Sequence, residues 1–214
     1  MKKFGFVFVF MLGFFAQSAM ADLMGLANGR SANLDNMADM SVEGGANIFS
    51  NGNLLGARAN FKASPDIMVF GDVGLLSIEN FNVDSDGLVY GFGAFYQLRN
   101  VTLLENTDFA VKGAYHLGTL EFDSSGTDID YSEISIDALI SGDQLAETGF
   151  GWYGNIGYHI VDTDLGNSTL FAGTTNNDIL IGGGVTKALA FGEFFLGLDF
   201  IDAATFVGGI RYNL

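Results

Sequence analysis

Apolar and polar residues alternate along the chain from about Met40 to its last residue, Leu214. Successive side chains of a β-strand point to opposite faces, so a period of two indicates strands with one apolar and one polar face. Residues 150–160 illustrate the pattern, with Phe150, Trp152, Ile156, Tyr158 and Ile160 on one face and Tyr153, Asn155 and His159 on the other. The alternation predicts an all-β chain.

Ten segments carry this alternation, each long enough for a tilted strand to cross a bilayer, which takes about 9–11 residues. They are 40–49, 53–62, 66–77, 87–98, 108–119, 129–140, 149–161, 178–187, 191–200 and 204–214. Turn-forming residues separate them, and the single proline, Pro65, falls in such a separator. Ten strands are expected, with eight as the alternative if one weak hairpin is misread. The connection at 99–107 is long for its side of the sheet, so a misassigned strand stays open there.

The two faces of these strands favour a closed, antiparallel, up-and-down transmembrane β-barrel over a soluble sandwich. The apolar face carries large aromatics expected near the strand ends, as in the interfacial girdles of membrane barrels. These are Tyr90, Tyr96, Tyr115, Trp152, Tyr158 and Tyr212. The other face carries many glycines and alanines, which suits a cramped barrel interior better than a solvated surface.

The first residues differ from the rest. Lys2 and Lys3 precede an almost unbroken apolar run at 4–15, and Ala19 and Ala21 stand where a signal peptidase reads small residues. That run would make a helix of roughly 18 Å, too short for a hydrocarbon core of about 30 Å. We therefore expect a signal peptide at 1–21, a polar N-terminal lead at 22–39 that matches neither strand nor helix periodicity, and a barrel at 40–214. An uncleaved anchor is the alternative.

Charge and cysteine content exclude several classes of function. The chain has no cysteine, so lipid attachment, disulfides and thiolate metal sites are excluded. Loss of Lys2 and Lys3 would leave seven basic residues against 25 acidic ones, a net charge of about −18. Nucleic acid is not expected as a partner, because phosphates need a basic surface. No cofactor or metal centre is predicted, although divalent cations are a hypothesis for the acidic loops and for contacts with lipopolysaccharide.

The final strand reads Phe206-Val207-Gly208-Gly209-Ile210-Arg211-Tyr212-Asn213-Leu214. It resembles the end of small Gram-negative outer-membrane barrels, the group that includes the transmembrane domain of OmpA and the opacity proteins. Members of that group commonly end on an alternating strand with an aromatic third from the end, which resembles the signal read by the barrel-assembly machinery. Phe206, Ile210, Tyr212 and Leu214 would form this signal, though Leu214 departs from the usual terminal phenylalanine. The resemblance covers about 40–214 and implies an outer-membrane location.

Twelve ionisable residues fall on the inward face of the predicted strands. They are Glu43, Arg58, Lys62, Asp72, Lys112, His116, Glu133, Asp137, His159, Glu193, Asp199 and Arg211. Charges buried in a narrow lumen must be paired, so we interpret this set as an ion-pair and hydrogen-bond network. A narrow pore lined by the same groups is the second interpretation.

The expected function is a structural role or a narrow passive route for small solutes. A surface adhesin acting through outward acidic loops at 78–87, 120–129 and 162–177 is one alternative. A barrel enzyme that hydrolyses lipids or peptides is another, with His116 and His159 as bases oriented by Glu133 or Asp137. No motif places a nucleophile beside either histidine, so the chain is not expected to be an enzyme.

Overall fold

The computed structural model describes residues 25–26, 29–35, 37–80, 83–101, 104, 106–122, 128–145, 148–164, 174–201 and 203–214. The predicted signal peptide at 1–21 lies outside these residues. Among the residues described, no helix is long and apolar enough to span a membrane.

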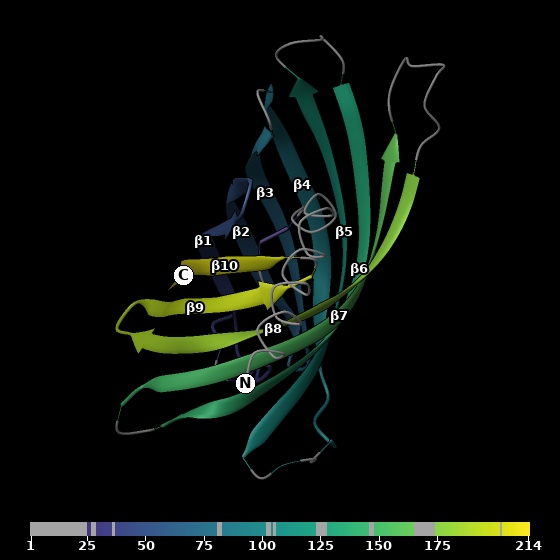
Figure 1. Cartoon of the computed structure of the whole chain (residues 1–214). Coiled ribbons are helices and arrows are strands. Elements are labelled where there is room, and N and C mark those ends of the chain that lie inside the picture. The colour runs from purple at the N-terminus through teal and green to yellow at the C-terminus, as the bar shows by residue number, and fades with distance from the viewer. Residues whose placement is uncertain are drawn as a thin grey trace, which may run out of the picture.

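Ten strands form one closed antiparallel barrel in which each strand pairs with its neighbours in sequence and β1 closes on β10 (Figure 1). The strands are β1 (Met40–Phe49), β2 (Gly52–Ser64), β3 (Ile67–Asn80), β4 (Val83–Gln97), β5 (Thr107–Phe122), β6 (Asp128–Leu145), β7 (Phe150–Asp164), β8 (Thr174–Leu189), β9 (Gly192–Phe200) and β10 (Ala204–Asn213). Closure leaves no strand with an unpaired edge, which a barrel needs in lipid.

The predicted barrel of ten strands is confirmed, and the alternative of eight is wrong. Residues 98–106 connect β4 to β5, and the described residues among them belong to no strand, so the possible strand at 99–107 is not found there. The main correction concerns the outward loops at 78–87, 120–129 and 162–177, because β3 to β8 continue into all three. Those polar residues lack the alternation that marks a strand, yet their backbones extend the hydrogen-bonded ladders beyond the apolar part of the wall.

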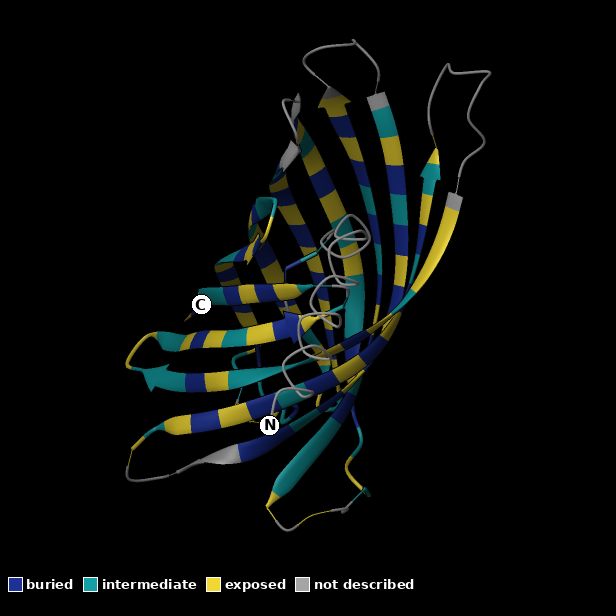
Figure 2. Cartoon of the chain, viewed as in Figure 1, coloured by how far each residue is buried: buried dark blue, intermediate teal, exposed yellow. Residues whose placement is uncertain are grey.

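Burial alternates along nearly every strand, so that buried and exposed residues form stripes around the barrel (Figure 2). The exposed stripe is apolar over much of its length, and Leu75, Phe92 and Ile136 each expose more than 60% of their surface. Phe206, Ile210, Tyr212 and Leu214 of the predicted assembly signal all point outward. Such a large exposed apolar surface needs an apolar surrounding.

The six predicted interface aromatics lie on the outer face, but only three lie near strand ends. Tyr96, Trp152 and Tyr212 stand within three residues of the end of their strands, whereas Tyr90, Tyr115 and Tyr158 lie near the middle of theirs. The prediction of strand-end positions is wrong for these three because β4, β5 and β7 are longer than expected. Four residues from Tyr90, Tyr115 and Tyr158, toward the nearest of the three acidic loops, the outward residue is polar. These residues are Asp86, Thr119 and Asp162.

Candidate functional site: a filled lumen

The interior of the barrel holds a stretch of chain that precedes the first strand. We call residues 25–39 the plug segment. Within it, Leu26, Arg30, Ala32 and Leu34 are each at most 3% exposed. The sequence predicted only a polar lead here, because its residues follow neither periodicity. The structure places Leu26, Arg30, Ala32 and Leu34 in the barrel core, whereas Asp35 and Asp39 are exposed.

Side chains of the wall satisfy the backbone of the plug segment, which forms no ladder of its own. Near its start, Asn47 donates to the Gly25 carbonyl at 3.0 Å and Arg58 to the Leu26 carbonyl at 2.6 Å. Arg211 donates to the Gly29 carbonyl at 3.1 Å. Near its end, Lys62 donates to the Leu34 carbonyl at 2.7 Å and the Leu34 N–H donates to Gln97 at 2.8 Å. Buried backbone groups need hydrogen-bond partners, and these inward polar side chains supply them for the plug segment.

Five charged residues on five neighbouring strands form a row of alternating sign, which we call the charge row. Register pairs Asp72 with Arg58, Arg58 with Glu43, Glu43 with Arg211, and Arg211 with Glu193. Arg58 binds Asp72 at 2.6 Å, and Arg211 Nε donates to Glu43 at 3.0 Å and binds Glu193 as well. Opposite charges on adjacent strands attract, so the charge row also holds β1 against β10 where the barrel closes.

Arg30 joins the plug segment to the charge row. Its guanidinium donates to Glu43 and to Asn60, both at 2.8 Å, and lies 4.1 Å from the centre of the Phe95 ring. Because Arg30 is 1% exposed, its charge depends on Glu43 for neutralisation. Sequence reasoning missed this residue. The signal was a charge imbalance, since six inward acids were predicted against four inward bases.

A second ionic group lies beside the charge row. His159 contacts Glu133 through Nδ1 at 2.7 Å and Asp137 through Nε2 at 3.0 Å, and Lys112 binds Asp137 at 2.7 Å. His116 contacts Asp72 of the charge row at 3.0 Å and is paired in register with Glu133, so it lies between the two groups. All twelve predicted lumen residues lie on the inner side. Ten are buried, and Lys62 and Glu193 are partly exposed.

Among the residues that the structure describes, no hydroxyl is hydrogen-bonded to either histidine. Both ring nitrogens of His159 are engaged by carboxylates. Ser135 faces His159 in register, but its hydroxyl has no hydrogen-bond partner among the described residues. His159 is therefore arranged as a bridge between two acids.

Two apolar clusters also fill the lumen. The first, which we call the apolar layer, lies toward the β1–β2, β3–β4 and β5–β6 ends of the strands and comprises Phe49, Leu54, Leu76, Ile78, Val89, Leu120, Tyr131 and Val161. The second packs Ala32 and Leu34 of the plug segment against wall residues that include Phe70 and Phe95. An apolar layer disfavours water and ions, and its residues come from β1 to β7.

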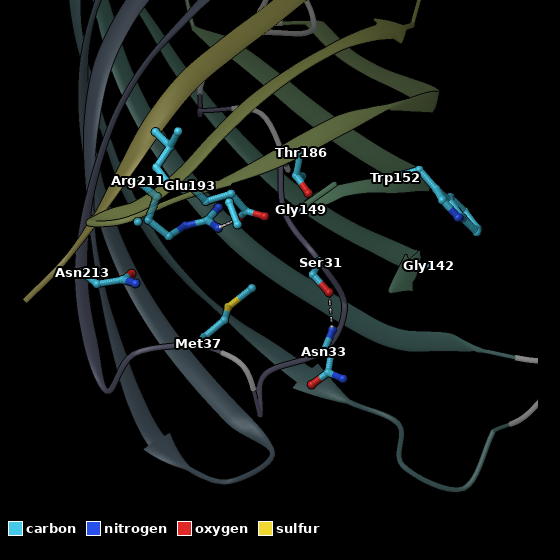
Figure 3. Close-up of a pocket in the computed structure, with 13 residues that line it drawn as sticks. Ser31, Asn33, Met37, Gly142, Gly149, Trp152, Thr186, Glu193, Arg211 and Asn213 are labelled. Carbon is cyan, nitrogen blue, oxygen red and sulfur yellow. Dashed lines mark hydrogen bonds and ion pairs between the residues drawn. The ribbon is translucent and has the colours of Figure 1, made fainter. Parts of the chain in front are cut away.

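A cavity of about 550 Å³ remains between the plug segment and the wall of β8 to β10 (Figure 3). Ser31, Asn33 and Met37 line it from the plug segment, and Thr186, Glu193 and Arg211 line it from the wall. The Glu193–Arg211 ion pair therefore borders this space while the rest of the charge row is buried.

The plug segment is also tied down where it leaves the lumen. Arg99, in the connection between β4 and β5, binds both oxygens of Asp35 at 2.7 and 2.8 Å and contacts Asp66. These hydrogen bonds from Arg99 lower the pKa of the exposed Asp35 carboxyl. A lowered pKa means that the ionised form stabilises the fold at neutral pH, and that this contribution is lost as pH falls through the folded-state pKa.

Asp35→Asn is therefore expected to lower the melting temperature at pH 7 by at most about 2 °C, because exposed ion pairs contribute little. The difference between variant and wild type should shrink as pH falls, because protonation of Asp35 below its lowered folded-state pKa removes the charge that Arg99 binds. Circular dichroism melts in detergent at pH 7 and pH 2.5 measure this. Asp39→Asn, an exposed change on the same segment, is the control, and an Asp35→Asn deficit as large at pH 2.5 as at pH 7 contradicts the assignment.

Comparison with known proteins gives the fold but no family. No family model matches the sequence, and no curated protein matches it. Among solved structures, the translocator domain of the autotransporter NalP from Neisseria meningitidis matches with a TM-score of 0.52 at 10% identity, over 85% of this chain and 91% of that one. A KdgM porin matches with a TM-score of 0.39 at 11% identity, over 81% of this chain and 99% of that one. With its closed ring of ten antiparallel strands, the chain has an outer-membrane β-barrel fold.

Proposed function

We propose, from this outer-membrane β-barrel fold, that the protein is a structural barrel of the outer membrane whose lumen is closed to solutes. The observation that carries the proposal is the plug segment, whose Arg30 is buried in the lumen and bound to Glu43. The apolar layer adds a second obstruction toward one end of the strands. The charged contact of the plug segment and the apolar layer together favour a structural scaffold over a passive pore.

An outer-membrane location is supported by the exposed apolar face and its aromatics, and by the signal-peptide pattern of 1–21. Acyl chains of membrane lipid and lipopolysaccharide would contact side chains such as Phe92 and Ile136. The outward Tyr212 and Leu214 of the last strand would be available to the barrel-assembly machinery during insertion. The proposal includes no catalytic activity, and the carboxylates that engage both nitrogens of His159 support this.

A narrow passive pore is the second candidate, and the cavity beside β8 to β10 is the observation that favours it. Its polar lining of Thr186, Glu193 and Arg211 would suit a small hydrated solute. The route would have to continue past the buried residues between that cavity and the other end of the barrel.

Planar bilayer recordings separate the two. We expect the purified full chain, refolded in detergent and checked by faster migration of the unboiled sample on a gel, to give no stable current steps in 1 M KCl. A porin of known conductance reconstituted in the same way serves as the positive control. Reproducible single-channel steps from the intact chain would overturn the closed scaffold and support the pore.

A further inference from the structure

Asp199, on the inner face of β9, lacks an ionic partner. Of the six predicted lumen acids, Glu43, Asp72, Glu133, Asp137 and Glu193 each contact a basic residue or a histidine. Among the residues that the structure describes, Asp199 has no such contact, and its Oδ1 has no hydrogen-bond partner. The residue is only 7% exposed. A buried carboxylate without compensation is costly, so something must neutralise it.

Two neutral side chains converge on the same place. Asn155 on β7 and Asp199 on β9 flank Gly182 of β8 in register. A Cβ added to Gly182 would stand 1.8 Å from Asp199 Oδ1 and 2.7 Å from Asn155 Oδ1, so both oxygens lie over the bare backbone of that glycine. Tyr153 of β7 is paired in register with Gly184, two residues along β8 from Gly182. A Cβ added to Gly184 would stand 2.7 Å from the Tyr153 hydroxyl oxygen.

These side chains are also unsatisfied. Tyr153 and Asn155 are 3% and 5% exposed, and the Tyr153 hydroxyl has no hydrogen-bond partner among the described residues. The Asn155 amide lies close enough to Asp199 to act on its carboxylate as a hydrogen-bond donor, while its Oδ1 has no partner among the same residues. Buried polar groups in folded proteins almost always have partners, and a bound ion or water is one explanation of a group that has none within the protein. Three neighbouring side chains on β7 and β9, all aimed at β8, therefore point to an occupant.

The local charges select a monovalent cation. Lys112, Asp137 and His159 are the charged groups that act on Asp199, and Lys112 and His159 already bind Asp137. Calcium takes six to eight oxygens, usually from several carboxylates. No group of three or more acidic, histidine or cysteine ligands that could hold a metal occurs among the described residues. One carboxylate with amide and phenol oxygens matches an ion of single charge.

We propose that Asp199 anchors a binding site for sodium or potassium on the inner face of β7 to β9, with Asn155 Oδ1 and the Tyr153 hydroxyl as neutral ligands. Water would complete the coordination of the ion. The cavity beside β8 to β10 gives an approach, because its lining residue Thr186 lies two positions from Gly184 on the same inner face. The site does not depend on whether the barrel conducts.

Thermal melts of the refolded full chain test the site. Melting is followed in detergent in 150 mM choline chloride, sodium chloride or potassium chloride, so that ionic strength is constant. Saturation of one site 10- to 100-fold above its Kd should raise the wild-type melting temperature by about 3–8 °C in sodium or potassium relative to choline. Asp199→Asn removes the charge and should melt at one temperature in all three salts.

Two further variants complete the experiment. Asp164→Asn, an exposed change at the end of β7, should keep the full increment. Asn155→Leu leaves every carboxylate in place and should reduce the increment by at least half, which gives a result even if Asp199→Asn does not refold. An increment of equal size in wild type, Asp199→Asn and Asn155→Leu would overturn the proposal. So would a wild-type melting temperature that is the same in choline, sodium and potassium.

Discussion

Glu43→Ala is expected to lower the melting temperature of the barrel by about 6–20 °C, a larger loss than from any exposed substitution. Glu43 contacts three guanidiniums, those of Arg30, Arg58 and Arg211. Removing one partner of a buried ion pair costs about 3–5 kcal/mol, because an uncompensated charge stays inside, and about 2–4 °C accompanies each kcal/mol in a domain of this size. Circular dichroism melts in detergent measure the change, with Glu121→Ala on the exposed face as the control.

The three arginines are not equally dependent on Glu43, and this gives a sharper test. Arg58 retains Asp72 and Arg211 retains Glu193, whereas Glu43 is the only acid in an ion pair with Arg30 among the described residues. The double variant Glu43→Gln/Arg30→Gln should therefore melt at a higher temperature than Glu43→Gln alone. A double variant whose loss equals the sum of the two single losses would contradict the assigned pairing.

Deletion of residues 25–37 is expected to lower the melting temperature by a similar amount, about 10–20 °C. The deletion removes Arg30, Ala32 and Leu34 from the interior, and it leaves wall groups such as Lys62 and Gln97 without their partners. Loss of a buried leucine alone costs about 2–5 kcal/mol. We expect little current from this variant in planar bilayers, because the apolar layer remains. A melting temperature within 2 °C of the intact chain would show that the segment does not stabilise the wall.

A substitution at Gly29 tests the plug segment without changing chain length. A Cβ on Gly29 would stand 2.0 Å from a carbon of the Phe195 ring, which is itself buried. Gly29→Val should therefore displace the segment and reproduce much of the loss seen on deletion. Gly44→Val is the matched control, since its added Cβ meets nothing within 4 Å.

The sequence predicts the wall of this barrel well because a period of two is a local property. Strand number, the inward position of Arg58 or Asp137 and the outward position of Trp152 all follow from neighbouring residues alone. The charge row does not follow, because it depends on register between strands. Its contact between Glu43 and Arg211 joins residues separated by 168 positions, across the pairing of the first and last strands.

The position of the plug segment inside the barrel could not be predicted from the sequence, for a different reason. The sequence of 25–39 has no period, and the described residues of this segment form no β-ladder. Their backbone bonds to side chains on several strands of the wall, such as Asn47, Gln97 and Ser141. No sequence pattern marks the residues that make these contacts. Only closure of the barrel brings them to one place.

Because β1 pairs with β10, closure of the barrel depends on its last strand. Arg211 lies on β10, so its ion pair with Glu43 of β1 forms only when the last strand of the barrel pairs with the first. A barrel without β10 would expose two sheet edges, those of β1 and β9, and would leave Glu43 without Arg211. Such a barrel would stay open beside the plug segment that the complete wall encloses.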